Sequence, residues 1–377
     1  MSADPKRIAN LVLRWGAAAL ARLPGGRRSP EPQNILVVRL GNLGDIVVSL
    51  PTFHAIRKLY PKARIILLTS PTRRGAPGAP EVLERDATFD ERIVYYADEA
   101  SALRFLRTLR QRIGELDIDF AIFLPGELAR FRSAAKYLAL FAVSGVRHVE
   151  GFRLIPPEGL TISEVERLMS YLAPLGATTV EPKPWLHPAE EDVARARTLL
   201  AGAEDKRLIG MQSGAVRPAN RWPEERFIEL GRRLCSDPDI RIALTGAEGD
   251  REANQRIAQA IGASCIDLSG QTTIAELAAV LQCAALLVSN DTGTMHVAAA
   301  VGTPVVAIFS ARYYPHIWYP YGDQHIVLRK DIECSLCQDD VCLRYQAPEC
   351  LARISVDEVY EAVASALRQA PPLAGQK

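Results

Sequence analysis

Short apolar runs alternate along the chain with segments in which apolar residues recur at helical spacing. The apolar runs, which we predict to be strands, cover residues 35–40, 64–69, 92–96, 120–124, 147–151, 207–211, 240–245, 285–289 and 304–309, with a shorter one near residue 266. The segments with helical spacing cover residues 46–60, 101–116, 133–143, 163–175, 224–235, 251–261, 273–283, 294–301 and 355–368. This alternation predicts an α/β protein built from doubly wound parallel sheets.

A proline-rich segment divides the alternation into two parts. Residues 176–188 contain Pro182, Pro184 and Pro188, which is typical of a linker. A chain of 377 residues is also long enough for two domains. The predicted organisation is a basic helix and linker at 1–33, a first Rossmann-like domain at 34–178, a linker at 179–190, a second Rossmann-like domain with a cysteine-rich segment at 191–354, and a C-terminal helix and tail at 355–377.

Composition narrows the class of protein. Hydrophobic residues make up 48% of the chain and charged residues 24%, which is typical of a globular protein with a large core. The formal net charge of +1 does not point to nucleic acid, and we expect no nucleic-acid partner. No apolar run is as long as a membrane span and no signal peptide is evident, so we expect a cytoplasmic protein. Seven cysteines, an odd number, fit a reducing compartment better than a disulfide scaffold.

The N-terminal segment has a character of its own. Residues 5–23 have helical spacing, with Trp15 among the apolar positions and several lysines and arginines on or beside the predicted helix. A basic amphipathic helix with a tryptophan can lie on an anionic membrane surface. It can equally pack against its own domain or a partner subunit, and the sequence leaves both possibilities open.

A turn that contains glycine follows the first predicted strand. Gly41 and Gly44 lie in this turn, and Asp45 stands at the start of the next helix. Ligands of open α/β sheets bind at the carboxyl ends of the strands, so Asp45 is a candidate base. The alternative is that Asp45 only caps the helix. The full Gly-x-Gly-x-x-Gly pattern is absent, which argues against a nicotinamide cofactor.

A later strand–turn–helix unit has the features of a phosphate site. An apolar run leads into Asp291, Thr292, Gly293 and Thr294, and a helix of small residues that carries His296 follows. Backbone N–H groups at a helix start, together with the helix dipole, attract a phosphate or diphosphate. Gly293 lets the ligand approach the backbone, the two threonines add hydroxyl donors, and Asp291 can hold a ribose or sugar hydroxyl. The alternative is an ordinary capped helix.

Other polar residues belong to the same edge of the second predicted sheet. Ser213, Glu248 and Asp291 each follow a predicted strand, and the carboxyl ends of parallel strands meet at one edge. A basic loop with Arg217 and Arg221 lies between two of these elements. A phosphate-binding helix start beside a basic loop and a carboxylate predicts a site for a nucleotide sugar.

Four cysteines form a compact set near the end of the second domain. They are Cys334, Cys337, Cys342 and Cys350. Four thiolates can hold zinc or iron in tetrahedral geometry, and the first pair has good ligand spacing. The second pair is seven residues apart, which is not the usual two-knuckle pattern. A structural Zn or Fe site therefore stands beside free thiols or local disulfides as an alternative.

Three motifs follow one another along residues 34–367. They are Arg39-Leu40-Gly41-Asn42-Leu43-Gly44-Asp45 with Pro51, then Arg221-Trp222-Pro223, then Ser289-Asn290-Asp291-Thr292-Gly293 with His296 and the following Gly302-Thr303-Pro304. In this order and at these spacings they resemble the motifs of glycosyltransferase family 9, the bacterial heptosyltransferase family. The resemblance implies a GT-B fold, in which two Rossmann-like domains face each other across a cleft. It also implies transfer of a heptose from ADP-heptose to the lipopolysaccharide core, with inversion at the anomeric carbon, at the cytoplasmic face of the inner membrane.

The resemblance also implies roles for particular residues. The catalytic base of the family corresponds to Asp45. The donor-binding positions correspond to Ser213, Arg221, Glu248, Asp291, Thr292, Gly293, Thr294 and His296, and we add Gly44 and Arg217 to this set. Family members often carry a lysine directly before the basic-Trp-Pro motif, where this chain has Asn220, so Arg217 or Arg221 would have to supply the positive charge.

The expected chemistry has two requirements. A base must take the proton of the acceptor hydroxyl as it attacks, which is the role of Asp45. The leaving diphosphate must be stabilised, which the helix start and the arginines can do without a divalent cation. No cofactor is therefore expected for catalysis. Two other functions remain open, a nucleotide-sugar epimerase on the same fold, for which Glu127 is the only further carboxylate, and a nucleotide-sugar-binding or assembly subunit without catalysis.

Overall fold

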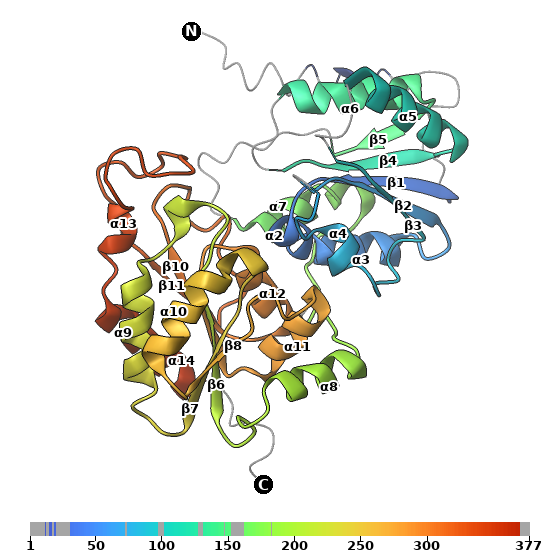
Figure 1. The fold of residues 1–377 in the computed structure, drawn as a ribbon. Coiled ribbons are helices and arrows are strands. Elements are labelled where there is room, and N and C mark those ends of the chain that lie inside the picture. The colour runs from blue at the N-terminus through green and yellow to red at the C-terminus, as the bar shows by residue number, and fades with distance from the viewer. Residues whose placement is uncertain are drawn as a thin grey trace. The chain divides into compact units, whose positions relative to one another are not determined.

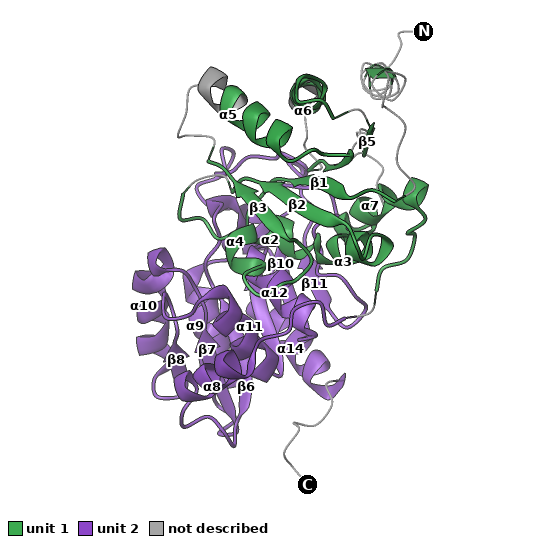
Figure 2. Cartoon of the chain, turned by 90° about the vertical axis from the view of Figure 1, so that its right-hand side faces the viewer, with its two compact units in different colours: residues 1–181 green, residues 182–377 purple. Residues whose placement is uncertain are grey.

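The structure of the protein is a computed structural model. It describes residues 12, 15, 16, 19, 31–71, 74–96, 102–126, 131–146, 148–151, 162–181 and 183–369. The predicted N-terminal helix at 5–23 lies outside these residues except for four positions, and Glu127 lies outside them altogether. The chain divides into two compact units, Met1–Glu181 and Pro182–Lys377, and the division falls within the proline-rich segment (Figure 2).

The first unit contains one five-stranded parallel sheet. Its strands are β1 (Asn34–Arg39), β2 (Arg64–Thr69), β3 (Glu91–Val94), β4 (Phe120–Leu124) and β5 (His148–Glu150), in the order β3-β2-β1-β4-β5. The central strands are buried on both faces, which is why their sequences are continuous apolar runs rather than alternating ones. The strand order reverses between β1 and β4.

Helices cover both faces of this sheet (Figure 1). They are α2 (Leu43–Val47), α3 (Leu50–Leu59), α4 (Ala79–Val82), α5 (Ala102–Glu115), α6 (Phe131–Val143), α7 (Glu164–Ser170) and the short 3-10 helix η1 (Ala173–Leu175). Side chains of α5 and α6 pack on one face, and α2, α3 and α7 lie on the other.

The prediction of one helix over residues 46–60 is wrong. The segment forms two helices, and the second has Pro51 in its first turn. Proline lacks an N–H group, and inside a continuous helix its ring would clash with the carbonyl one turn earlier. The helix therefore ends and restarts just before the proline, where no amide is lost.

The second unit contains a six-stranded parallel sheet. Its strands are β6 (Arg207–Gln212), β7 (Ile240–Leu244), β8 (Cys265–Asp267), β9 (Leu286–Asn290), β10 (Val305–Phe309) and β11 (Ile326–Arg329), in the order β11-β10-β9-β6-β7-β8. This is the strand order of a dinucleotide-binding Rossmann fold, with its reversal between β6 and β9. The edge strand β11 was not predicted from the sequence, and its apolar run, Ile326, Val327 and Leu328, is only three residues long.

The helices of this unit also form two layers (Figure 1). They are α8 (Glu190–Leu199), η2 (Pro218–Asn220), α9 (Glu224–Leu234), η3 (Glu248–Asp250), α10 (Arg251–Ile261), α11 (Ile274–Cys283), α12 (Gly293–Val301), α13 (Glu349–Ala352) and α14 (Val356–Gln369). Side chains of α9, α10 and α14 share one core with the sheet, and those of α8 and α11 pack on its other face. The predicted C-terminal helix is thus part of the core of this unit.

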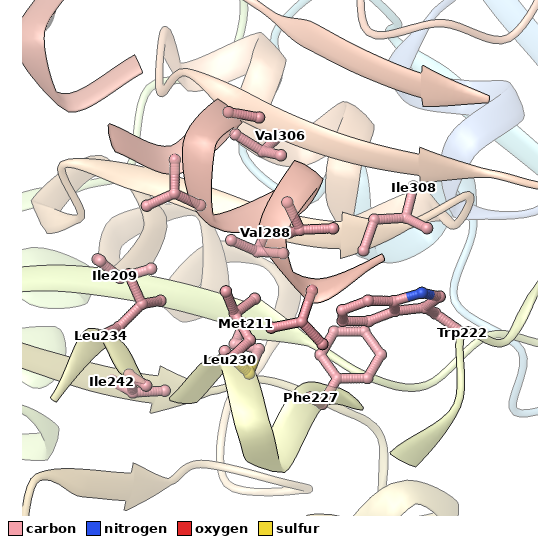
Figure 3. Close-up of a cluster of buried hydrophobic side chains, with 14 of the residues drawn as sticks. Ile209, Met211, Trp222, Phe227, Leu230, Leu234, Ile242, Val288, Val306 and Ile308 are labelled. Carbon is pink, nitrogen blue, oxygen red and sulfur yellow. The ribbon is translucent and has the colours of Figure 1, made fainter. Parts of the chain in front are cut away.

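Trp222 connects this core to the edge of the sheet. Its ring lies edge-on to Phe227 on α9, with 5.0 Å between the ring centroids (Figure 3). Its backbone N–H donates to the Asn290 side chain at 3.1 Å, and its indole N–H donates to the Ile354 carbonyl at 3.0 Å. The loop that contains Arg221 is therefore held beside the end of β9.

Candidate functional site

Asp45 lies where the strand order of the first sheet reverses. It follows β1, and its carboxylate is about one-third exposed, with Oδ2 accepting from the Asn42 N–H at 3.0 Å and Oδ1 at 3.6 Å from Nη2 of the buried Arg39. The turn needs glycine at Gly41, where φ is +142° and an added Cβ would lie 2.3 Å from Cβ of Asp45. Gly44 belongs to α2 directly before Asp45. A carboxylate that is held by these contacts and remains partly exposed is suited to accept a proton.

Hydrogen bonds join the strand ends of the second sheet at the corresponding place. The Ser213 hydroxyl donates to the Asn254 side chain at 2.5 Å, and the Asn290 amide donates to the Ser213 carbonyl at 2.6 Å. Asn254 also donates to the carbonyl of Thr245, directly after β7, at 3.1 Å. The ends of β6, β7 and β9 are thereby held together, as the sequence predicts for this edge. As a result, the Ser213 hydroxyl already donates its hydrogen bond to Asn254.

Asp291 is tied to the loop that precedes α9. The Asn220 amide donates to the Asp291 carboxylate at 2.9 Å, and its carbonyl accepts from the Ser310 hydroxyl at 2.7 Å. Burial raises the pKa of Asp291 to about 6, against the opposing influence of Arg217, Arg312 and the Asn220 hydrogen bond. Asn220 is 2% exposed, so it acts as a brace between three segments rather than as a surface ligand.

The helix α12 begins directly after this brace. Thr292 is its extended N-cap residue, and its side chain makes no capping hydrogen bond. Gly293 and Thr294 form the first turn, whose backbone N–H groups have no acceptor within the helix. His296 is 5% exposed and lies edge-on to Trp318, and burial lowers its pKa to about 4. It is neutral at pH 7 and supplies no positive charge here.

Three arginines lie on the loops around α12, and one of them was missed by the sequence reasoning. Arg312 follows β10 and is 8% exposed, and it interacts electrostatically with Asp291, as does Arg217. The guanidinium groups of Arg312 and Arg217 both donate to Oδ1 of Asp340, at 2.9 and 2.8 Å. Arg221 is exposed and donates to the Ala215 carbonyl at 2.8 Å. The rule that ligands meet strand ends would have indicated Arg312, because it stands three residues after β10.

Glu248 lies at the same sheet edge in η3, after β7. Its carboxylate is exposed and accepts two hydrogen bonds from Arg251, at 2.8 and 2.6 Å. These hydrogen bonds lower the pKa of Glu248. The carboxylate is therefore ionised at neutral pH and can accept hydrogen bonds from ribose hydroxyls.

The cysteine-rich segment lies next to Arg312 and to the short helix η2. All seven cysteines of the chain are free thiols. One small cavity is lined by Cys334, Cys337, Cys342 and Cys350, together with Arg312 and Ala219. Thiol groups suit zinc or iron by their chemistry, although the described residues include no group of three or more ligand-type side chains at metal-binding spacing.

The chain was compared with known proteins. Residues 106–347, more than half of the chain, match the model of glycosyltransferase family 9 (heptosyltransferase). A curated relative, lipopolysaccharide heptosyltransferase 2 of Escherichia coli, is 27% identical over 300 residues, which cover 73% of this chain and 82% of the relative. The chain belongs to glycosyltransferase family 9, and it is a glycosyltransferase.

Solved structures support the same fold. The glycosyl transferase family 9 structure from Veillonella parvula has a TM-score of 0.73 at 22% identity, with 90% of this chain and 98% of that chain covered. The E. coli ADP-heptose lps heptosyltransferase II structure has a TM-score of 0.66 at 23% identity, with 89% and 99% covered. Together with the two Rossmann-like units, these similarities confirm the GT-B fold class. In the part of the chain that the structure describes, no helix is both long and apolar enough to cross a bilayer.

The raised pKa of Asp291 predicts how stability changes with pH. The value is about 6 in the folded protein against 3.8 as the reference value, so the folded state holds this proton more tightly. The stabilisation is complete below pH about 4 and is lost as the pH rises through about 6. We expect the free energy of unfolding of wild type to fall relative to that of Asp291→Asn as the pH rises through this window, because unfolding of wild type releases up to one proton there. Denaturant unfolding of both proteins at several pH values measures the difference.

Glu248→Gln is the matched control for this measurement. The pKa of Glu248 is lowered from 4.5, so its stabilisation is present above that pH and is lost only as the pH falls below it. A difference between wild type and Asp291→Asn that stays constant from pH about 4 to about 6 would show that Asp291 does not hold its proton as described.

Proposed function

We propose that this protein transfers a heptose from ADP-heptose to the lipopolysaccharide core, with inversion at the anomeric carbon and Asp45 as the general base. The observation that carries the proposal is the carboxylate of Asp45, held by Asn42 and Arg39 at the end of β1 and about one-third exposed, in a chain of the heptosyltransferase family. The names of its relatives support the donor and the acceptor, because they include an ADP-heptose heptosyltransferase and a lipopolysaccharide heptosyltransferase.

The donor is proposed to bind at the carboxyl edge of the second sheet. The diphosphate lies against the N–H groups of Gly293 and Thr294 at the start of α12. Arginine supplies the positive charge, because Asn220 is neutral and uses its amide on Asp291 and Ser310. The remaining contacts are assigned to Gly44, Ser213, Arg217, Arg221, Glu248, Asp291, Thr292 and His296.

Arg312 is the arginine best suited to the diphosphate. It is buried beside Asp291, and hydrogen bonds to the carbonyls of Gln338 and Asp339 at 2.7 and 2.6 Å hold it in place. Its contact with Asp340 is shared with the more exposed Arg217. A carboxylate oxygen that bridges two guanidinium groups occupies the kind of position that a phosphate oxygen takes, so the donor can displace the exposed Asp340.

The proposed reaction is a single displacement. The acceptor hydroxyl attacks the anomeric carbon while Asp45 takes its proton, and the bond from the anomeric carbon to the diphosphate oxygen breaks. The departing ADP carries the negative charge, which the first turn of α12 and Arg312 stabilise. These groups make the same contribution that a divalent cation makes in other transferases, so no cofactor is required in this account.

Replacing the base tests the mechanism. We expect Asp45→Asn to bind ADP-heptose as wild type does and to lose transfer by about 10²–10⁴-fold, because the amide cannot accept the proton. Calorimetric titration with ADP-heptose and a transfer assay on purified core acceptor measure the two effects. The matched control is Asp86→Asn, which removes a carboxylate that pairs with His54 elsewhere in the unit. Transfer that survives in Asp45→Asn would refute the assigned base, and donor binding without transfer in wild type would favour a binding subunit.

Removing the buried arginine tests the donor site. We expect Arg312→Met to weaken ADP-heptose binding by about 10- to 100-fold, the loss of one charge-assisted contact to phosphate. Arg217→Met should cost less, because its side chain is about half exposed. Arg226→Met is the control, since Arg226 donates to the Ile354 carbonyl on the core side of α9. Unchanged affinity in Arg312→Met, measured by the same titration, would remove Arg312 from the donor site.

A structural zinc or iron at Cys334, Cys337, Cys342 and Cys350 is also proposed. The support is the shared cavity and the soft donor set, and binding would require the loop to draw the thiols closer than the described positions. We expect elemental analysis of the purified chain to give about one metal per protein, lost in Cys334→Ser and retained in the control Cys283→Ser, which lies outside the cavity. A metal-free wild type would overturn this proposal.

A peripheral position at the cytoplasmic face of the inner membrane is the last part of the proposal. Residues 1–30 are basic, and Val12 and Trp15 expose 52% and 62% of their surface. We expect the full chain to sediment with vesicles of anionic phospholipid and the chain without residues 1–30 to remain in solution. Vesicles of neutral phospholipid serve as the control for charge. Equal sedimentation of both proteins would contradict the membrane role of this segment.

A further inference from the structure

A group of buried charges lies behind Asp45. Arg39, at the end of β1, is fully buried, and its guanidinium donates through Nε to the Ser49 hydroxyl at 2.9 Å. Its Nη2 donates to Glu164 Oε1 and to the Asp45 carbonyl, both at 3.2 Å. Glu164, 1% exposed, also accepts two hydrogen bonds from the buried Arg167, at 2.5 and 2.7 Å. The four charged residues come from β1, α2 and α7.

Within these four described residues, the charges are equal in number when Asp45 is counted as ionised. Arg39 and Arg167 contribute two positive charges, and Glu164 contributes one negative charge. The carboxylate of Asp45, with Oδ1 3.6 Å from Nη2 of Arg39, is the second negative charge. The positive charge of Arg39, 3.6 Å from Oδ1, favours the ionised carboxylate and therefore opposes protonation of Asp45. Of the described helices, α4 also packs on α2, and the carboxylate of its Glu81 accepts from the Gly78 N–H.

The same contacts fix the position of Asp45. Its carbonyl accepts from both the Ser49 hydroxyl, at 2.6 Å, and Arg39 Nη2, and its Oδ2 accepts from the Asn42 N–H. The base is thus held at its backbone and at one carboxylate oxygen. A general base must be aligned with the hydroxyl it deprotonates, and small displacements slow the reaction strongly.

The arrangement is poorly explained by stability alone. Nη1 of Arg39 is buried and has no hydrogen-bond partner among the described residues. Buried ion pairs are often no better for stability than apolar side chains of similar size, and an unsatisfied buried N–H makes this one worse. Arg39 lies next to a candidate base, and its burial is better explained by an effect on the ionisation and alignment of that base than by stability.

We propose that Arg39 is a positioning residue that holds Asp45 ionised and aligned, and that Glu164, clamped by Arg167, limits how strongly Arg39 does so. The inference rests on the proposed function, because it concerns the base of that reaction. Its consequence is that the two charges affect Asp45 in opposite directions. Loss of Arg39 removes the positive charge that favours the ionised base, whereas loss of the Glu164 charge leaves that positive charge less compensated.

The test is the pH dependence of kcat/KM for heptose transfer by the full chain, with ADP-heptose and core acceptor. We expect the acidic limb to move to higher pH by about one unit in Arg39→Met, with a loss of about tenfold at a pH below the limb. Glu164→Gln should move the limb to lower pH. The double variant Arg39→Met/Glu164→Gln removes one charge of each sign, so its limb should return towards that of wild type. For the same reason we expect it to be the least destabilised of the three variants.

Two controls separate this inference from its alternatives. Arg57→Met breaks an ion pair with Asp90, at 2.5 Å in the same unit, and should leave the limb in place. A purely structural role for Arg39 predicts lower rates with an unmoved limb in all variants, and that result would overturn the inference, as would limbs that move in the same direction in both single variants. Full transfer by Asp45→Asn would instead refute the base itself, so the two failures are distinguishable.

Discussion

Both sheets of this protein are entirely parallel, and this constraint decides where its polar residues can act. Parallel strands present all their carboxyl ends at one edge, and the strand order reverses between β1 and β4 in one unit and between β6 and β9 in the other. Asp45 follows β1, and Asp291 follows β9. The central strands are largely apolar and buried along the rest of their length, so their carboxyl ends are where polar residues can meet a ligand.

The two edges are equipped for different tasks. At the first, buried charges converge on one carboxylate: Arg39 is paired with Glu164, and Glu164 is clamped by Arg167. At the second, neutral amides hold the strand ends in register while positive charge comes from the start of α12 and from arginines on the surrounding loops. One edge is suited to accept a proton and the other to bind an anion. A transfer reaction from a sugar diphosphate to a hydroxyl needs both.

Much of this could be predicted from the sequence, and the remainder depends on tertiary contacts. Continuous apolar runs identified the buried strands, and the turns around Asp45 and Asp291 follow from glycine and strand-end rules. The break before Pro51 was not predicted, because the apolar residues keep their helical spacing across it. The pairing of Arg39 with Glu164 joins residues 125 positions apart, so no local pattern reveals it. In the sequence, Asn220 stands where family members often carry a positively charged lysine. In the structure its side chain forms hydrogen bonds with Asp291 and Ser310 and links the segments that contain them.

The stereochemistry of the transferred sugar tests the central claim most directly, because a single displacement by a base-activated hydroxyl must invert the anomeric carbon. The measurement is the NMR assignment of the anomeric configuration in the donor and in the isolated product, after reaction of the full chain with ADP-heptose and core acceptor. The account predicts opposite configurations in donor and product. Product with the configuration of the donor would contradict the account. Retention requires a covalent intermediate or a front-face attack, and neither route is the single displacement in which Asp45 acts as the base.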